Sequence, residues 1–166
     1  MKPIPAETVA SRQTRIANLP EEALEELIDQ ASEEQPFMLA YLMATGEAEF
    51  NASEQELLLY IGVVVWQIMR EEHADMRALT EEDLDTAEET NRQLIEYLEG
   101  EPEHELFETV ETVIGGYNQG PLLRFVIETV MDEDEEAFDD MEPVRDEMKG
   151  MLIFYLKILI DCLDLA

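Results

Sequence analysis

The sequence predicts an all-α fold, a compact single-domain bundle of about six to seven helices. From residue 20 onward apolar residues recur at helical spacing, and no stretch shows the alternation of apolar and polar residues typical of a strand. Prolines and glycines fall where these periodic stretches begin and end. The chain has 166 residues, 46% of them hydrophobic, which is enough for one buried core.

The first two helices of the bundle are expected to begin at prolines. Pro20 suits the first position of a helix, where a backbone N–H has no partner within the helix. Pro36 begins the second helix, which runs to a glycine stop at Gly46. The apolar face of the first helix is made of Leu24, Leu27, Ile28 and Ala31.

The third predicted helix, 54–73, is the candidate for the centre of the bundle. Ser53 and Glu56 form the pattern of a capping box at its start. Between Leu57 and Met69 this helix is apolar on every side. Such a helix must be surrounded by other helices.

The fourth predicted helix follows Thr80 and stops at Gly100. Threonine is a good N-cap, and the three acidic residues after it favour the positive end of the helix dipole. Polar Asn91 falls within an otherwise apolar seam of heptad-like spacing. The other members of this seam are Leu84, Ala87, Leu94 and Leu98.

Three further helices complete the predicted bundle. The fifth covers residues 103–117, and the sixth begins at Pro121 after a glycine-rich break. Pro143 begins the seventh, whose second half, 151–165, is apolar nearly all round. We expect this C-terminal helix to be the second strongly buried element.

The order of elements suggests an internal duplication. In both 20–73 and 103–165, a helix is followed by a short helix that begins at proline, an acidic linker and a long apolar helix. This predicts two three-helix units related by pseudo-symmetry, with their apolar helices against each other. Helices that begin at proline are common, so coincidence is the alternative.

The charge divides the chain into two parts. Residues 1–19 carry three basic residues and one acidic residue, whereas residues 20–166 carry 7 basic and 40 acidic residues. We therefore expect a basic N-terminal arm at 1–19 and an acidic helical domain at 20–166. The arm is predicted to be flexible. Alternatively, it lies on the acidic domain and is held there by an attraction that salt screens.

The total net charge of −31 excludes some classes of partner. A surface this negative repels phosphate backbones and anionic lipid headgroups, so we expect neither nucleic acid nor a membrane surface as a partner. The two longest apolar stretches, 57–69 and 152–160, are shorter than the roughly 18 to 20 residues that cross a bilayer. With one cysteine and no apolar run of a signal peptide near residue 1, the chain is expected to be cytoplasmic and not exported.

We predict no catalytic, cofactor-binding or metal-ligating residues, and therefore no enzyme. A di-iron site in a helix bundle needs two Glu-x-x-His pairs, but His104 lies at a helix start and His73 has no Glu three residues before it. The acidic run 132–136 has the composition of a calcium loop. However, Ala137 and Pro143 stand where an EF-hand needs Gly and Glu.

Other residues with chemical potential have structural interpretations. Cys162 lies in an apolar helix beside an acidic residue, which disfavours the thiolate and predicts core packing. Lys157 is expected to reach solvent or to pair with a carboxylate across the bundle. His73 is expected at the C-terminal end of its helix. Four aromatic residues form either a pocket lining or ordinary core, namely Phe37, Tyr41, Tyr60 and Trp66.

Residues 101–106, Glu-Pro-Glu-His-Glu-Leu, resemble the Pro-Asp-His-Leu region of the TorD-like chaperones that mature redox enzymes. The resemblance lacks the Asp before the His and the Leu directly after it, and it does not extend beyond these residues. It therefore implies no binding residues for this chain. TorD-like chaperones are cytosolic, all-helical and acidic, and the resemblance implies a partner-binding protein.

The expected function is that of a non-enzymatic helical interaction module, such as an adaptor, a chaperone or a small regulator. Its partner is expected to be a basic or amphipathic segment of another protein, because opposite charges attract and steer binding. We also expect a homodimer, with the apolar C-terminal helix as the preferred contact.

Three alternatives to this function remain open. The acidity is also typical of salt adaptation, since the chain has many glutamates and only three lysines. A DNA mimic that occupies a DNA-binding protein would need carboxylates at phosphate-like intervals in space. A small-molecule or metal enzyme is the third alternative, because helical interiors assemble sites from residues far apart in sequence.

Overall fold

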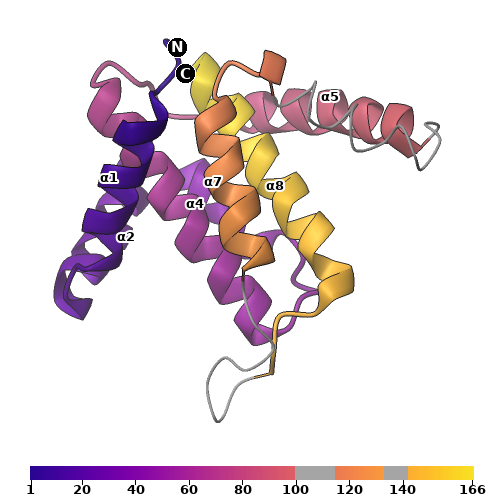
Figure 1. Cartoon of the computed structure of the whole chain (residues 1–166), viewed down its shortest axis with the longest axis horizontal. Coiled ribbons are helices and arrows are strands. Elements are labelled where there is room, and N and C mark those ends of the chain that lie inside the picture. The colour runs from indigo at the N-terminus through magenta and orange to yellow at the C-terminus, as the bar shows by residue number, and fades with distance from the viewer. Residues whose placement is uncertain (100–114, 133–141) are drawn as a thin grey trace.

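The computed structural model describes residues 1–99, 115–132 and 142–166. Within these ranges the chain forms seven helices that pack against one another and no strand (Figure 1), which confirms the all-α prediction. The helices are α1 (Ala6–Ala17), α2 (Glu21–Glu34), α3 (Pro36–Ala44), α4 (Ala52–Glu72), α5 (Glu81–Glu99), α7 (Gly120–Met131) and α8 (Asp146–Leu165).

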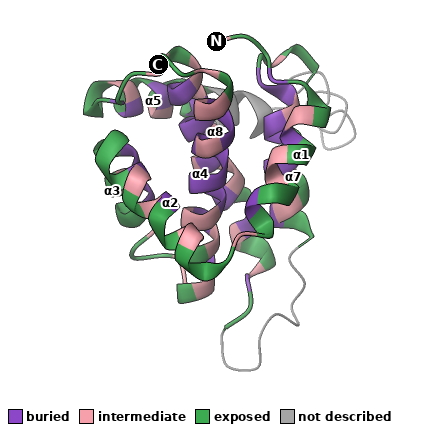
Figure 2. Ribbon diagram, turned by 90° about the vertical axis from the view of Figure 1, so that its left-hand side faces the viewer, coloured by how far each residue is buried: buried purple, intermediate pink, exposed green. Residues whose placement is uncertain are grey.

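Helices α4 and α8 form the centre of the bundle. They pack against each other, and α4 also contacts α1, α2 and α3, while α8 contacts α5 and α7. Buried residues therefore line both helices on several sides, as Figure 2 shows for α4. The central position predicted for 54–73 is confirmed. Much of the apolar surface of α8 is buried inside its own chain, while residues 153–155 are partly buried, and the expected homodimer stays a prediction.

The packing of α4 against α8 agrees with one consequence of the predicted duplication, which places the two apolar helices together. Most of the predicted fifth helix, at 103–117, lies outside the described residues. The duplication itself therefore stays a prediction.

The start of α4 differs from the prediction. The capping box is formed by Asn51 and Glu54, each side chain bonding the other's backbone N–H at 2.9 Å, and not by Ser53 and Glu56. The predicted cap is therefore wrong, and the reason is that asparagine is as good an N-cap as serine, so local preference alone does not decide between residues 51 and 53. The Glu54 side chain of this capping box also forms an ion pair with Arg145.

Glu54 joins the start of α4 to the start of α8. Its fully buried carboxylate accepts hydrogen bonds from Arg145 Nη2 at 2.7 Å, Arg145 Nε at 2.9 Å and the Arg145 backbone N–H at 2.9 Å. These bonds hold Arg145 in an extended conformation as the N-cap of α8. The prediction that Pro143 begins this helix is therefore wrong, and α8 begins at Asp146.

The N-terminal segment 1–19 is helical and lies on the acidic body. Helix α1 packs against α4 and α7, and its segment buries Ile4, Val9 and Ile16. The expected flexibility of the arm stays a prediction, and the segment is placed as in the alternative of an arm lying on the domain. The physical reason is that three apolar side chains accompany the basic residues and provide a contact that salt does not screen.

Helix α3 approaches α4 closely at a glycine. A Cβ atom on Gly62 would lie 2.5 Å from Leu42 Cδ1, so a larger residue would push α3 outward. Gly150 of α8 is also helical, but a Cβ atom there would meet no other group within 4 Å. These two glycines offer a matched pair of substitutions.

We predict opposite effects for Gly62→Ala and Gly150→Ala. At Gly150 alanine should stabilise the protein by about 0.5–1 kcal/mol through its higher helix propensity. At Gly62 overpacking against Leu42 should outweigh that gain and cost about 1–3 kcal/mol. Urea unfolding followed by circular dichroism measures the free energy of unfolding of both variants. Equal stabilisation by alanine at the two sites would contradict the close packing of α3 on α4.

The Glu54–Arg145 contact predicts a dependence of stability on pH. Burial alone raises the pKa of Glu54, but the Arg145 side chain and the backbone N–H groups of Arg145 and Asn51 outweigh it, so this pKa lies below its usual value. The folded pKa is then lower than the unfolded pKa. The pair therefore stabilises the fold above the usual carboxyl range, and this stabilisation is lost as the pH falls through the folded pKa.

We predict that Glu54→Gln lowers the free energy of unfolding at neutral pH by about 1–3 kcal/mol, because a charged hydrogen-bond acceptor is lost. The loss should shrink when unfolding is measured below a pH of about 4. Glu56→Gln is the matched control, since Glu56 is exposed on the same helix. A loss of stability at Glu54 that does not change with pH would argue against an ionised carboxylate.

Candidate functional site

Asp161 is the centre of a polar cluster between α5 and α8. Its carboxylate accepts hydrogen bonds from the Tyr117 hydroxyl, from Asn91 Nδ2 at 2.6 Å and from Lys157 Nζ at 2.8 Å. Lys157 also donates to Asn91 Oδ1 at 2.7 Å and lies 4.8 Å from the centre of the Tyr117 ring. Lys157 pairs with a carboxylate of its own helix, and not with one across the bundle as predicted, because its contact across to α5 is the Asn91 amide oxygen. The described partners account for the polar groups of this cluster, which fixes α5 on α8.

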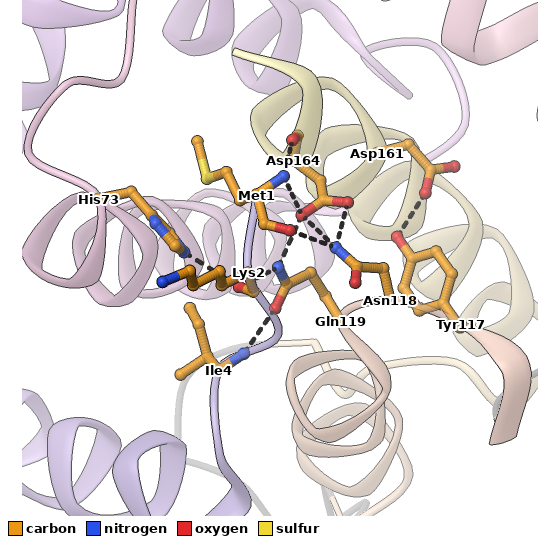
Figure 3. Close-up of polar contacts among 9 residues, drawn as sticks. All are labelled: Met1, Lys2, Ile4, His73, Tyr117, Asn118, Gln119, Asp161 and Asp164. Carbon is orange, nitrogen blue, oxygen red and sulfur yellow. Dashed lines mark hydrogen bonds and ion pairs between the residues drawn. The ribbon is translucent and has the colours of Figure 1, made fainter.

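A second polar cluster joins the first residues of the chain to the end of α8. Gln119 Nε2 donates to the Asp164 carboxylate at 2.6 Å and to the Lys2 carbonyl at 3.1 Å, and Gln119 Oε1 accepts from the Ile4 N–H at 3.1 Å. His73, the C-cap of α4 as predicted, places Nε2 3.1 Å from the same Lys2 carbonyl. Figure 3 shows this second cluster, together with the Tyr117–Asp161 contact of the first.

Cys162 is a buried core residue, as predicted. Its thiol donates to the Asp83 carbonyl at 3.4 Å. Burial and the nearby carboxylates of Asp161 and Asp83 raise the pKa of Cys162 to about 12. A thiol with this pKa is almost entirely protonated at neutral pH and is a poor nucleophile.

The other sequence candidates are dispersed. Trp66 is fully buried, Tyr41 and Tyr60 are partly buried, and Phe37 is 47% exposed. The ring contacts of Tyr41 join it to Tyr155, which in turn contacts Phe50 and Phe154, so the four predicted aromatics do not line one pocket.

Neither metal candidate region places ligands together among the described residues. His104, the residues 101–106 of the chaperone resemblance and most of the acidic run after Asp132 lie outside the described ranges. Inside those ranges, no group of three or more His, Cys, Asp or Glu side chains is arranged to hold a metal ion. The expected absence of a metal stays a prediction. None of the described helices has both the length and the apolar character needed to cross a membrane.

A cleft of about 510 Å³ lies between α5 and α8. Its polar lining includes Asp83, Lys157 and Asp161, which are engaged in ion pairs with described neighbours. Asp83 pairs with Arg77, whose hydrogen bonds hold the Asp83 pKa well below its usual range. Because these groups already have partners, the cleft offers little unsatisfied hydrogen bonding to a ligand.

Helix α3 presents the most unusual surface of the described chain. Its nine residues carry no charge and are apolar on both sides, so one side remains outside when the other packs on α2 and α4. Met38 and Leu42 are buried, whereas Phe37 is 47% and Met43 61% exposed. We call the outward side the α3 face, and Figure 2 shows it at the edge of the bundle. It consists of Pro36, Phe37, Ala40, Met43 and Ala44.

Hydrogen bonds at both ends hold α3 rigidly in place. At its start the buried Gln35 side chain donates to the Arg77 carbonyl at 2.9 Å and accepts from the Leu79 N–H at 2.8 Å. At its end Gln55 Nε2 donates to the Leu42 carbonyl at 2.6 Å. The turn that follows uses Gly46 with φ 71°, a conformation that favours glycine.

Carboxylates lie immediately before and after the α3 face. Glu33 and Glu34 end α2, and Glu47 and Glu49 follow α3, all four with exposed side chains. Glu34 pairs with Arg70 at 2.5 Å. The α3 face is therefore an apolar strip between two acidic ends. The composition of 36–44 was visible in the sequence, but the side that stays exposed was not.

Comparisons with protein-family models, with curated proteins and with solved structures find no match for this chain. Its function is therefore inferred from geometry and charge.

We predict that Cys162 resists thiol reagents in the folded protein. Its reaction with a disulfide-exchange reagent should be at least about 100-fold slower than in the same chain unfolded by guanidinium chloride, because the thiol is both buried and protonated. The unfolded chain is the control for intrinsic reactivity. A folded protein that reacts as fast as the unfolded one would show that α5 does not cover this residue.

Proposed function

We propose that this protein is a helical interaction module whose α3 face binds an amphipathic helix of a partner protein. The partner helix carries an apolar stripe and basic residues at both ends of it. The proposal depends on one observation, the apolar α3 face with Phe37 and Met43 exposed on a rigid helix. Contiguous apolar surface surrounded by polar residues is typical of interaction sites.

The dimensions of the α3 face suggest what the partner presents. Phe37 and Met43 are six residues apart, which corresponds to about 9 Å along a helix. An amphipathic helix places side chains at i, i+3, i+4 and i+7 on one side and matches this spacing over about two turns. Methionine adapts its shape to different apolar partners, which suits a binding surface.

Charge favours a basic partner over a second copy of the chain. Two copies would each bring a net charge of −31 to the interface, whereas lysines and arginines would face the acidic ends of the α3 face. The homodimer is an alternative that the experiment below separates from peptide binding, and the salt adaptation and the DNA mimic remain alternatives.

A fluorescent peptide of leucine, alanine and lysine, arranged as an amphipathic helix, tests the proposal. We expect the double variant Phe37→Ser/Met43→Ser to bind it at least about tenfold more weakly than the wild type, which corresponds to about 1.4 kcal/mol. Met131→Ser is the matched control, because Met131 of α7 is 56% exposed and should not contribute. Fluorescence anisotropy gives both affinities.

Two control peptides separate specific docking from charge alone. A peptide of the same composition in scrambled order keeps the charge and loses the apolar stripe, and a peptide with glutamate in place of lysine loses the attraction. Both should bind at least about tenfold more weakly. Equal affinity for the ordered and scrambled peptides would reject the α3 face, and stronger self-association than peptide binding in high salt would favour the homodimer.

A further inference from the structure

Helix α1 and the residues before it have the same chemistry as the partner that the acidic domain is expected to attract. The segment 1–19 has a net charge of +2, and the rest of the chain has −33. It forms one amphipathic helix preceded by an extended stretch. The structure therefore contains one basic amphipathic segment already bound to the acidic body.

The charged contacts of α1 are concentrated at the end of α4. Arg12 pairs with Glu71 and, at 2.9 Å, with Glu72, and Arg15 also pairs with Glu71. Arg15 is half exposed and Arg12 about one third exposed, so salt can screen these pairs. A rise in ionic strength therefore weakens these ion pairs between α1 and α4.

The apolar contacts of α1 are few. Ile4, Val9 and Ile16 are the buried apolar residues of the segment, and they lie against α4 and α7. An open cleft of about 680 Å³ remains along the seam between α1 and α7. Its apolar lining comes from small residues on one side and larger ones on the other, namely Pro3, Ala6 and Ala10 facing Pro121 and Phe125.

The polar contacts to the extended stretch are made to its backbone. Hydrogen bonds to backbone N–H and C=O groups do not select side chains, so other segments with a similar backbone path can make them. They come from the segment 118–119 at the start of α7 and from the end of α4 (Figure 3). The pairs are Asn118 Nδ2 with the Met1 carbonyl at 2.9 Å, Gln119 Nε2 with the Lys2 carbonyl at 3.1 Å, Gln119 Oε1 with the Ile4 N–H at 3.1 Å and His73 Nε2 with the Lys2 carbonyl at 3.1 Å. The Met1 ammonium adds a charged contact, a hydrogen bond to the Asp164 carbonyl at 2.7 Å.

We propose that the surface under α1 is a second binding site, and that α1 is its exchangeable internal ligand. The site consists of the α4–α7 groove, Glu71 and Glu72, and the backbone-binding side chains of Asn118 and Gln119. Its external occupant is a basic segment that is extended at first and then forms an amphipathic helix, as residues 1–17 do. This goes beyond the proposed function, because α1 and α3 lie on opposite sides of α4 (Figure 2).

Hydrogen exchange on the full-length wild type tests whether α1 detaches. We expect the amides of α1 to exchange at least tenfold faster than those of α4 and α8, and to become faster still between about 0.1 M and 1 M salt as the arginine pairs are screened. The proposal is overturned if α1 exchanges only at the rate of α4 and α8 at both salt concentrations. That result would make α1 a fixed part of the core.

A labelled peptide of residues 1–19 tests exchange of the ligand. Arg12→Glu/Arg15→Glu should free the site of its internal ligand, so the peptide should bind this full-length variant at least tenfold more tightly than the wild type, where α1 competes. Arg92→Glu is the control, since Arg92 pairs within α5 and is distant in sequence from the site. Phe37→Ser/Met43→Ser should leave the affinity for the 1–19 peptide unchanged. The proposal for the α3 face can therefore fail without affecting the proposal for the site under α1.

Equal binding of the peptide to the wild type and to Arg12→Glu/Arg15→Glu would overturn the proposal. A loss of helix content in this variant larger than the 12 residues of α1 can account for, seen by circular dichroism, would also overturn it, because an exchangeable ligand is not required for folding of the other helices. A peptide in which both arginines are replaced by glutamate should bind at least tenfold more weakly. Equal binding of that peptide would show that Glu71 and Glu72 do not form part of the site.

Discussion

The burial of α4 is the constraint on which the rest of the structure depends. Its residues from Leu58 to Met69 are nearly all inaccessible to solvent, which requires neighbours on every side. α8 covers one side, and α1, α2 and α3 cover the others. A helix that covers α4 needs an apolar stripe on one side only. α3 has two apolar sides, so its contact with α4 leaves the second side exposed.

Because positive charges are few, the ion pairs between the described helices occur at only a few positions. The chain has ten basic and 41 acidic residues. Several of the basic residues form polar contacts between two helices, which we call joints. At these joints a cation offsets the mutual repulsion of nearby carboxylates and adds directed hydrogen bonds. The joints between helices are Arg12 with Glu72, Arg70 with Glu34, Arg145 with Glu54 and Lys157 with Asn91. Exposed joints such as that of Arg12 depend on salt more than the buried Glu54 joint does.

Parts of both proposed surfaces could be anticipated from the sequence. The apolar composition of 36–44, the basic character of 1–19 and the polar position of Asn91 in an apolar seam are all visible in the sequence. The prediction placed the carboxylate partner of Lys157 across the bundle, whereas Asp161 lies four residues later on the same helix. The pairing of Gln119 with the backbone of residues 2–4 could not be predicted, since nothing local links positions more than 100 residues apart.

The sequence by itself determined the all-α class, the two helices that must be buried and the excess of negative charge on the remaining surface. These properties follow from periodicity and composition, which act over a few helical turns. Only the tertiary structure decided that Asn51 and not Ser53 caps α4, that α1 lies in a groove and that Phe37 and Met43 stay exposed. Each of these outcomes depends on contacts between distant segments, such as Glu54 with Arg145, whose geometry the local pattern does not contain.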